Sequence, residues 1–496
     1  MVLAGFSVGR KSGVIFMPVI TGDEYKKRIN ALNAEVWVAG NKLNGNISEH
    51  PDFAGIIKSQ AGLYDLQHTL HSQMTFASET TGNKVGLSYL IPRTKGDLER
   101  RRRMIQLWAR HSGGVMGRSP DYMNTVLAAF AASVDVLDGE EHCYPDRLLK
   151  LYEFARENDL SFTHTFVNPQ NNRSKLAFLE EDVTNARIIE RNDEGIIIKG
   201  AKLLATQGGI TDELIVFSAP GVQDNSQAYG FSIPTDTDGL KFVCRESFAN
   251  GNQGASFDYP LSSRFEEMDT IVIFDKVTVP WERVFLHDNI KAASNLYAKG
   301  KFVPFTLHQI ACRQIIKTEF LLGIAKRMVE TINIGDYQHV QSKIVELIKG
   351  LETMEALVIK AEYEAKVDCT GVMVPARLPL YVAVNQFQEL YPRFTEIIQL
   401  LGASGMMTIP KKVDFDSEIG EQLQHFLQGF EVKGEKRVEL FRLAWDLTMS
   451  SFGSRQTLYE RFFFGDPIRI SQTIYQIYDD TSSTSLVDGF LSKKAD

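Results

Sequence analysis

The spacing of apolar residues changes twice along this chain of 496 residues, and that change limits the folds open to it. Apolar residues recur at helical spacing up to about residue 160 and again from about residue 289, whereas the stretch between them consists of short β-branched and aromatic runs separated by Gly, Asn and Asp. This order predicts a mostly α-helical protein with a β middle domain. The expected parts are an N-terminal extension (1–20), a helical domain (21–160), a β domain (161–288) and a helix bundle (289–496).

Individual segments support this order. T-G-D-E at residues 21–24 has the form of a capping box, so we expect the first helix to begin there and to continue to residue 38. Further helices are predicted over 95–111, 122–136, 302–334, 338–365, 378–401, 433–449 and 455–463. Strands are predicted over 161–167, 186–189, 195–199, 213–219, 228–234, 270–274 and 276–279.

Charge and cysteine content argue against several classes of protein. The 54 basic and 62 acidic residues leave a net charge of −8, and a nucleic-acid partner is not expected because such proteins favour a basic face. The sequence holds no run of the roughly 18 apolar residues that a membrane-spanning helix needs. The four cysteines form no C-x-x-C pair, so we predict no metal site. So few cysteines in a long chain are typical of a reducing compartment, and we expect a cytoplasmic protein.

The segment G-R-S-P-D-Y at residues 117–122 is the first candidate for chemistry. Pro120 favours the first turn of a helix, and the serine before it can cap that turn. Arg118 and Tyr122 are four residues apart and share one face if the turn is helical. Together they offer a fixed positive charge and a phenolic hydroxyl to a bound oxygen atom. The alternative is an ion pair between Arg118 and Asp121 at an ordinary helix start.

A histidine on a predicted strand is the second candidate. In F-T-H-T-F at residues 162–166, the strand period places His164 on one face with Phe162 and Phe166, which is unusual for a solvated face. A histidine there can accept or donate a proton near neutral pH. The alternative is a core histidine whose hydrogen bonds are satisfied.

Four other segments suit a large polar ligand or have ordinary structural explanations. Residues 168–173 form a run of amide and guanidinium donors suited to a flavin ring edge or a pyrophosphate, or else a polar loop. Residues 205–209 end a strand in a glycine turn, where Thr206 is a possible donor to a flavin. Residues 401–405 either admit an adenine or phosphate or end a helix. Residues 462–469 read as an aromatic core segment followed by a turn and a surface arginine.

These segments occur in an order that resembles one enzyme family. From about residue 21 to residue 478 the chain is similar to the oxygenase component of 4-hydroxyphenylacetate 3-monooxygenase. The likeness rests on G-R-S-P-D-Y at 117, T-H-T-F-V-N-P-Q at 163, P-L-S-S-R-F-E-E-M-D at 260, V-P-W-E-R-V-F at 279, Y-P-R at 391, L-G-A-S-G at 401 and Y-E-R-F-F-F-G-D-P-I-R at 459.

The resemblance implies a fold, a cofactor and a reaction. The implied fold is that of acyl-CoA dehydrogenases, with a helical domain, a β-barrel and a C-terminal four-helix bundle, and the implied assembly is a homotetramer. FADH2 is implied to come from a separate NAD(P)H:flavin reductase. O2 then forms a flavin C4a-hydroperoxide, which hydroxylates a small phenol, such as 4-hydroxyphenylacetate or a relative, ortho to its hydroxyl.

The same resemblance assigns the candidate site residues. Arg118, Tyr122 and His164 are expected to hold the phenol oxygen and to carry catalysis. Arg118 would also steady the hydroperoxide, and His164 would take the phenol proton. The residues expected to contact the flavin are His164, Thr165, Phe166, Gln170, Asn171, Asn172, Arg173, Thr206, Asp466, Pro467, Ile468 and Arg469.

Two departures from the family pattern bear on the substrate. Phenylacetate hydroxylases of the family hold the substrate carboxylate with a Ser-Thr pair, whose place is taken here by Ala219 and Pro220, just after Ser218. These three residues are expected at the far end of the substrate. Neither Ala219 nor Pro220 has a side chain that donates a hydrogen bond, which weakens the case for 4-hydroxyphenylacetate itself. Residues 138–146 form a longer connection than usual and are expected to reshape the mouth of the pocket.

Two other flavoenzymes are alternatives. An acyl-CoA dehydrogenase would use a glutamate base beside oxidised FAD and would not need the set of Arg118, Tyr122 and His164. A 4-hydroxybutyryl-CoA dehydratase, which is a hydroxyacyl-CoA dehydratase, would ligate an iron–sulfur cluster through several cysteines. The first helical domain of this chain holds only Cys143.

Overall fold

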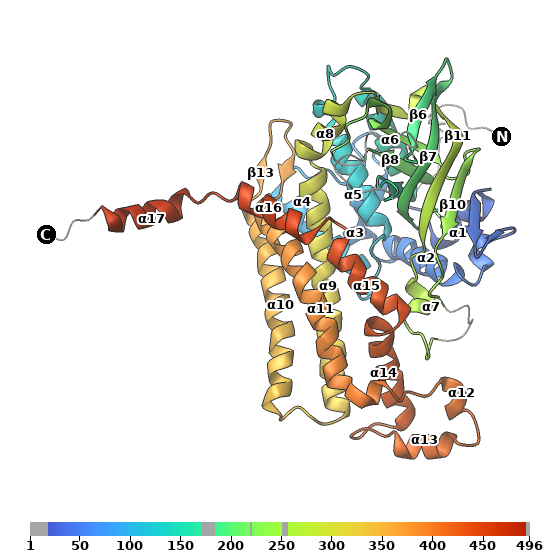
Figure 1. The fold of residues 1–496 in the computed structure, drawn as a ribbon, viewed down its shortest axis with the longest axis vertical. Coiled ribbons are helices and arrows are strands. Elements are labelled where there is room, and N and C mark those ends of the chain that lie inside the picture. The colour runs from blue at the N-terminus through green and yellow to red at the C-terminus, as the bar shows by residue number, and fades with distance from the viewer. Residues whose placement is uncertain (1–17, 171–183, 219–220, 250–255, 493–496) are drawn as a thin grey trace.

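The computed structural model describes residues 18–170, 184–218, 221–249 and 256–492. Figure 1 shows a helical N-terminal region and a β region beside an upright bundle of long helices, with a C-terminal arm that leaves the body. The predicted order of helical, β and helical regions is confirmed.

The N-terminal region is mostly helical. Its first helix, α1 (Gly22–Ala31), begins at the predicted capping box, in which the Thr21 hydroxyl accepts from the Glu24 amide and the Glu24 carboxylate accepts from the Thr21 amide. The prediction that this helix reaches residue 38 is wrong, because Glu35–Val38 is a β-branched and aromatic run that forms strand β1. The other elements are α2 (Ala54–Thr69), α3 (His71–Met74), α4 (Lys95–His111), α5 (Pro120–Ala131), α6 (Pro145–Asn158), β2 (Asn41–Lys42), β3 (Thr75–Ala77) and β4 (Lys84–Gly86).

The β region forms two sheets. A six-stranded sheet has the order β2-β1-β10-β11-β7-β6, and a four-stranded sheet has the order β12-β9-β8-β5. The strands of this region are β5 (Phe162–Thr165), β6 (Arg187–Arg191), β7 (Gly195–Thr206), β8 (Glu213–Phe217), β9 (Tyr229–Pro234), β10 (Leu240–Cys244), β11 (Asp269–Pro280) and β12 (Val284–His287).

The strand pairing refines the prediction in three places. The described strands of the expected barrel are hydrogen-bonded to one another as two sheets. The strands expected over 270–274 and 276–279 are one strand, β11, with a bulge where Lys276 has a φ of 58° and the register with β7 shifts. Strand β10 is absent from the prediction, and it pairs in parallel with β1, so strand pairing crosses the expected domain boundary at residue 160.

The C-terminal region is a bundle of long helices. α9 (Phe302–Thr331), α10 (Gln338–Tyr363) and α11 (Arg377–Gly402) pack on one another, and α14 (Gly434–Thr448) and α15 (Ser451–Phe462) cover α11. These bounds confirm the predicted helices. Among the described residues, every helix lacks the combination of length and apolar character that crossing a membrane requires. Smaller elements are α7 (Ser262–Phe265), α8 (Ile290–Ala298), α12 (Lys412–Phe415), α13 (Gly420–Phe426), β13 (Lys366–Val367) and β14 (Met373–Val374).

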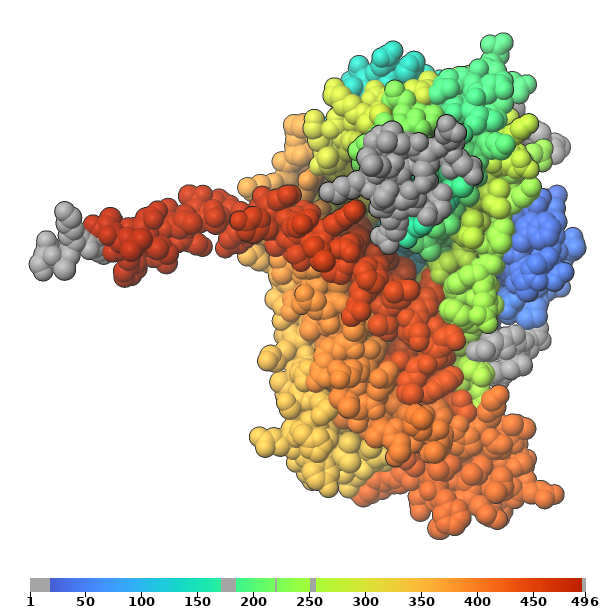
Figure 2. Space-filling model, in the orientation of Figure 1, coloured from blue at the N-terminus to red at the C-terminus, as the bar shows by residue number. Residues whose placement is uncertain are grey.

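The described chain ends in an arm formed by α16 (Pro467–Ile477) and α17 (Thr481–Leu491). Figures 1 and 2 show α17 standing clear of the body. No residue of α17 is buried, and Leu486, Val487, Phe490 and Leu491 are 66%, 57%, 73% and 78% exposed. An apolar surface of this kind is typical of a contact with another protein chain.

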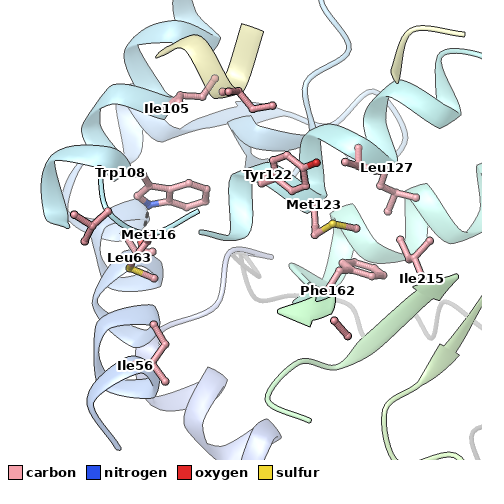
Figure 3. Packing of buried hydrophobic residues seen from close by; sticks show 14 of the residues in the cluster. Ile56, Leu63, Ile105, Trp108, Met116, Tyr122, Met123, Leu127, Phe162 and Ile215 are labelled. Carbon is pink, nitrogen blue, oxygen red and sulfur yellow. Dashed lines mark hydrogen bonds between the residues drawn. The ribbon is translucent and has the colours of Figure 1, made fainter. Parts of the chain in front are cut away.

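A continuous hydrophobic core joins the three regions. In Figure 3, Met123 and Leu127 of α5 lie beside Phe162 of β5 and Ile215 of β8. α5 is buried along its whole length and contacts β5 on one side and α9 on another. The first turn of α5 therefore lies where all three regions meet, and the candidate site is built around that turn.

Candidate active site

Arg118 and Tyr122 lie together at the start of α5, as their spacing predicts. The Cζ atom of Arg118 is 4.2 Å from the centroid of the Tyr122 ring, a cation–π distance. Tyr122 is buried, and burial raises the pKa of its hydroxyl, which therefore stays protonated at neutral pH. The Nε atom of Arg118 is buried and has no hydrogen-bond partner in the described part of the chain. The pair thus holds donors for a bound oxygen atom.

The alternative interpretation, an ion pair between Arg118 and Asp121, is wrong. Asp121 accepts hydrogen bonds from the Ser119 hydroxyl and, at 2.9 Å, from the Gln309 side chain of α9. Burial raises the pKa of Asp121 to about 6, against the opposing effect of those hydrogen bonds. Asp121 therefore ties the start of α5 to the bundle and leaves the guanidinium of Arg118 to other partners.

A buried carboxylate fixes the backbone just before α5. Glu267 is fully buried and accepts hydrogen bonds from the backbone amides of Gly117 and Arg118, both at 2.7 Å. The carbonyl oxygen of Arg118 accepts from the side chains of Gln60 at 3.1 Å and Gln207 at 3.2 Å. Gln207 also donates to Glu267 at 3.1 Å. Because both backbone groups of Arg118 are held, its Cα cannot shift without breaking buried, charge-assisted hydrogen bonds.

His164 lies on β5 with Phe166 on the same face, as the strand period predicts. The centroid of its ring is 5.7 Å from that of Tyr122 and 5.5 Å from that of Phe166. Its Nδ1 atom is buried without a partner among the described residues, which contradicts the alternative of a fully satisfied core histidine. Burial and the charge of Arg118 hold the pKa of His164 well below its usual range. The imidazole is therefore neutral at pH 7 and able to accept a proton.

A second carboxylate of the 260–269 motif links the β region to the bundle. Asp269 accepts from Arg455 of α15 at 2.7 and 2.8 Å and from Arg245 at 3.1 Å. Burial alone would raise the pKa of Asp269, but Arg455 and Arg245 hold that pKa well below its usual range. Asp269 also accepts from the Thr206 hydroxyl at 2.8 Å. The expected hydrogen bond from Thr206 to a flavin therefore competes with a bond inside the protein.

The residues after His164 are held against β7. The Thr165 hydroxyl donates to the Leu203 carbonyl at 2.6 Å, and the Phe166 carbonyl accepts from the Lys202 ammonium at 3.3 Å. Lys202 is buried and donates to the side-chain oxygen of Asn168 at 2.7 Å. Burial lowers the pKa of Lys202 to about 7, without an opposing contribution from a carboxylate in the described ranges. No sequence motif had singled out Lys202 as a titratable group.

The polar run at residues 168–173 is only partly described. The Asn168 side chain donates to that of Gln227 at 3.3 Å, and Gln170 is exposed at the end of a described range. Three of the expected flavin contacts lie outside the described residues: Asn171, Asn172 and Arg173. Their contact with the flavin stays a prediction.

The expected flavin residues on the last part of the chain form an exposed helix start. Asp466 caps α16, where its carboxylate accepts from the amides of Ile468 at 2.8 Å and Arg469 at 3.3 Å. Pro467 occupies the first turn, where its missing N–H costs nothing. Ile468 is 69% exposed and Arg469 is exposed as well. The Asp466 carboxylate is therefore engaged, whereas the side chains of Ile468 and Arg469 are accessible to a ligand.

The expected far end of the substrate site is partly described. The Ser218 hydroxyl accepts from the Tyr229 amide at 2.8 Å and is 3.0 Å from the Tyr229 carbonyl. These contacts link Ser218 to Tyr229 of β9, so in this structure the Ser218 hydroxyl supports the pairing of β8 with β9. Ala219 and Pro220 lie outside the described residues, so their contact with a substrate stays a prediction.

Two further segments from the sequence serve packing. Residues 138–146 run along β12 through backbone hydrogen bonds, and their expected effect on the pocket mouth stays a prediction. Residues 401–405 end α11, and a Cβ on Gly402 would lie only 2.2 Å from the sulfur of Met406. This close packing favours the helix-end interpretation of that segment over a nucleotide site.

Three of the supporting residues had not been singled out from the sequence: Glu267, Gln60 and Gln207. Glu267 lies inside a quoted motif, but a motif does not say which backbone amides a carboxylate will meet. Gln207 lies inside the segment 205–209, where only Thr206 was given a role, and Gln60 lies in no quoted segment. Both reach Arg118 from positions far apart in the chain. Long-range contacts of this kind appear only in the folded structure.

The unpartnered buried polar atoms fit a flavin and a phenol. Arg118 Nε and His164 Nδ1 have no partner in the described structure, and leaving such atoms unpaired costs about 1–3 kcal/mol each. Their presence indicates a bound group rich in oxygen and nitrogen acceptors. The edge of a flavin ring and the oxygen of a phenol are groups of that kind.

Comparison with known families covers almost the whole chain. The profile described as 4-hydroxyphenylacetate 3-hydroxylase N terminal matches residues 21–286, and the profile described as its C terminal matches residues 293–492. The chain belongs to the 4-hydroxyphenylacetate 3-hydroxylase family. The family suggested by the motifs is thereby confirmed.

Similar members of the 4-hydroxyphenylacetate 3-hydroxylase family include a protein from Bacillus subtilis strain 168, named probable 4-hydroxyphenylacetate 3-monooxygenase. It is 53% identical over 479 residues, which span 96% of this chain and 99% of the relative. A solved oxygenase component of 4-hydroxyphenylacetate 3-monooxygenase, complexed with FAD and 4-hydroxyphenylacetate, is 42% identical with a TM-score of 0.90. The match covers 95% of this chain and 98% of that one.

The dehydratase alternative shares the fold of the family. An archaeal 4-hydroxybutyryl-CoA dehydratase superimposes with a TM-score of 0.87 over 96% of each chain, at 20% identity. At that identity the likeness shows the fold alone. The matches at 53% and 42% identity are to monooxygenases, so the monooxygenase family, rather than either alternative, is the one to which this chain belongs.

Proposed function

We propose that this chain is the oxygenase component of a two-component monooxygenase that uses FADH2 and O2 to hydroxylate 4-hydroxyphenylacetate ortho to its phenol hydroxyl. The supporting observation is the junction of Arg118, Tyr122 and a neutral His164, where buried polar atoms have no partner among the described residues. The relatives add support, because the solved one binds FAD and 4-hydroxyphenylacetate.

Arg118 and Tyr122 bind the phenol oxygen in this proposal. Bound FADH2 supplies the two electrons with which one atom of O2 leaves as water while the other enters the ring. The guanidinium of Arg118 stabilises the negative charge that grows on the phenol oxygen, and it does so more strongly in a buried site than in water. The Tyr122 hydroxyl, kept protonated by burial, donates a second hydrogen bond.

His164 takes the phenol proton. Loss of that proton raises the electron density of the ortho carbon, which makes it a better nucleophile. The transfer needs an unprotonated imidazole, and burial together with the Arg118 charge keeps His164 in that form. Because the same two effects make His164 a weaker base, the transfer also needs the pKa of the bound phenol to be lowered. The same Arg118 charge lowers the pKa of a phenol bound beside it, which makes the proton easier to remove.

The flavin is proposed to lie along β5 and β7, beside His164, Thr165, Phe166 and Thr206. The hydroxyls of Thr165 and Thr206 are engaged with Leu203 and Asp269, so their contribution would come from backbone atoms. The far end of the flavin would reach Gln170, Asn171, Asn172, Arg173, Asp466, Pro467, Ile468 and Arg469.

The proposed partners are a separate NAD(P)H:flavin reductase and further copies of this chain. The exposed apolar side chains of α17 support association into a homotetramer, since a second copy would cover them. FADH2 would pass from the reductase by diffusion. The expectation of a cytoplasmic protein stays a prediction.

A product assay with a matched substrate panel tests the proposal. The chain, a flavin reductase, NADH, FAD and O2 are incubated with 4-hydroxyphenylacetate, 4-ethylphenol, tyramine or 4-nitrophenol, and products are identified by mass spectrometry. We expect 3,4-dihydroxyphenylacetate as the main product. 4-Ethylphenol is the control, since it matches the substrate in size but has no carboxylate. Absence of any catechol, or oxidation of an acyl-CoA instead, would contradict the proposal.

A further inference from the structure

Tyr459 of α15 contacts Arg118 across 341 positions of the chain. The Nη1 atom of Arg118 donates to the Tyr459 hydroxyl at 2.5 Å, and the Arg118 Cζ atom is 5.6 Å from the centroid of the Tyr459 ring. Burial raises the pKa of Tyr459, so this hydroxyl stays protonated and neutral at neutral pH. The contact joins the C-terminal region to the start of α5.

Gly117 provides the space that this contact needs. A Cβ atom on Gly117 would lie 2.2 Å from the Tyr459 hydroxyl oxygen, well inside van der Waals contact. Any side chain at position 117 would therefore push Tyr459 away from Arg118. The glycine that begins the G-R-S-P-D-Y motif thus has a physical explanation in the position of Tyr459.

Tyr459 is itself held firmly. Its ring stacks on Phe463 one helical turn later, with centroids 4.4 Å apart and planes 6° apart. The next residue, Glu460, is buried and accepts from Arg313 at 2.7 and 2.9 Å and from Lys317 at 2.8 Å. This buried ion network on α9 fixes α15 at the position of Tyr459, so the hydroxyl is a rigid acceptor for Arg118.

We propose that Tyr459 is a positioning residue for hydroxylation, which fixes the direction of the Arg118 guanidinium. The Tyr459 hydroxyl and, at 3.0 Å, the Gly117 carbonyl accept hydrogen bonds from Nη1. Glu267 holds the backbone of Arg118, and Nε is left for the oxygen of a bound ligand. The inference rests on the proposed function, because it assigns Arg118 a role in binding that oxygen. Without Tyr459 the long arginine side chain regains rotational freedom, and a displacement of about 1 Å at such a group costs on the order of 100-fold in rate.

The test uses Tyr459→Phe, which removes one oxygen and keeps the ring stack. With 4-hydroxyphenylacetate, a reductase, NADH and FAD, we measure the catechol formed and the H2O2 released per NADH consumed. We expect Tyr459→Phe to lower the catechol fraction by about tenfold and to raise H2O2 correspondingly. Flavin affinity and the thermal midpoint should stay within error of wild type. A crystal structure of the variant should show Arg118 in more than one rotamer.

Two comparisons separate positioning from a merely structural role. Tyr391→Phe is the matched control, since it removes another buried tyrosine hydroxyl, one without a partner in the described structure, and it should leave the catechol fraction unchanged. In an Arg118→Lys background, Tyr459→Phe should have no further effect, because the group that it positions is already lost. Gly117→Ala should reproduce the Tyr459→Phe defect by displacing the tyrosine.

The outcomes are distinct. Wild-type coupling in Tyr459→Phe, or equal losses from Tyr459→Phe in the wild-type and Arg118→Lys backgrounds, overturns the positioning role and leaves the proposed function standing. Failure of the wild-type chain to form catechol from any phenol overturns the proposed function and the positioning role with it. Loss of coupling only where Arg118 is present, with an unchanged thermal midpoint, supports both.

Discussion

The two ends of the candidate site are built in different ways. Around Arg118, backbone and side chain are held by groups from four separate parts of the chain, at the buried Gln60, Gln207 and Glu267 and at the half-buried Tyr459. Around residues 466–469, the expected flavin contacts lie on an exposed helix start, where Ile468 is 69% exposed. The Arg118 end is surrounded by residues of this chain, and the other end presents its side chains to solvent.

This difference corresponds to two kinds of binding. A group that stabilises developing charge must be oriented before the reaction, and the buried hydrogen bonds around Arg118 provide that orientation. A cofactor that arrives reduced and leaves oxidised in every cycle needs an accessible entry, and an exposed helix start allows one. The contrast predicts that substitutions at the buried end affect catalysis, with a loss of stability where a buried carboxylate is removed, whereas substitutions at the exposed end affect flavin binding alone.

The largest effect is expected from Glu267→Gln. A glutamine amide would point an N–H group at the amide of Gly117 or Arg118, so one of two buried hydrogen bonds becomes a repulsive contact. We expect a loss of about 3 kcal/mol in the free energy of unfolding and loss of hydroxylation, measured by urea denaturation and product assay. Glu282→Gln, at an exposed carboxylate, is the control and should change neither. A stable, active Glu267→Gln protein would show that the buried end is less constrained than its contacts indicate.

Arg118→Met should abolish hydroxylation and raise the pKa of His164. Removal of a nearby positive charge favours the imidazolium form, so the titration midpoint of His164 moves upward, although burial still holds it below the usual range. Histidine NMR titration checks the shift, with the His164 signal assigned from a His164→Ala sample. An unchanged midpoint would mean that burial alone lowers the pKa of His164.

At the exposed end, Arg469→Ala should raise the apparent KM for FADH2 several-fold, with the free energy of unfolding unchanged within about 0.5 kcal/mol. The reason is that Arg469 is exposed and available to a phosphate group. Arg327→Ala, at another exposed arginine on a helix, is the matched control. A large loss of stability in Arg469→Ala would show that this end of the site, like the buried end, contributes to the stability of the fold.

The smallest effect concerns Lys202, which lies on β7 beside Phe166 and Asn168. Folding lowers its pKa from 10.5 to about 7, so the unfolded chain holds more protons between those values and the cost of burying the charge is greatest at pH 7 and below. Lys202→Met should therefore stabilise the chain by about 1 kcal/mol at pH 6 and less at pH 10. Thermal unfolding at both pH values measures the difference, and an equal effect at both would exclude titration as its cause.

The sequence predicted the elements better than it predicted their contacts. Long amphipathic helices such as α9 and α10 follow from local periodicity, and the capping box at Thr21 marked its helix start correctly. Strand β1 was taken as helix because four residues give too short a pattern to outweigh the preceding helical spacing. Bounds that depend on local composition are therefore more predictable than those set by pairing with distant strands.

The candidate site divides in the same way. Arg118, Tyr122 and His164 were identified from motifs, and the structure brings them together. That Ser218 and Asp466 are engaged in hydrogen bonds within the protein was not predictable, because their partners are set by strand pairing and by a helix cap. Glu267 was quoted within a motif without a role, since only the folded chain shows the amides it faces.

The contact between Arg118 and Tyr459 also has a consequence for biosynthesis. A ribosome makes the chain from its N-terminus, so Arg118 leaves the exit tunnel long before Tyr459 does, and earlier domains fold first. A nascent or prematurely terminated chain that lacks residue 459 can form the α5 segment but cannot orient its arginine. Such a chain also lacks the proposed flavin contacts at residues 466–469, so both the oriented arginine and the flavin site depend on completion of translation.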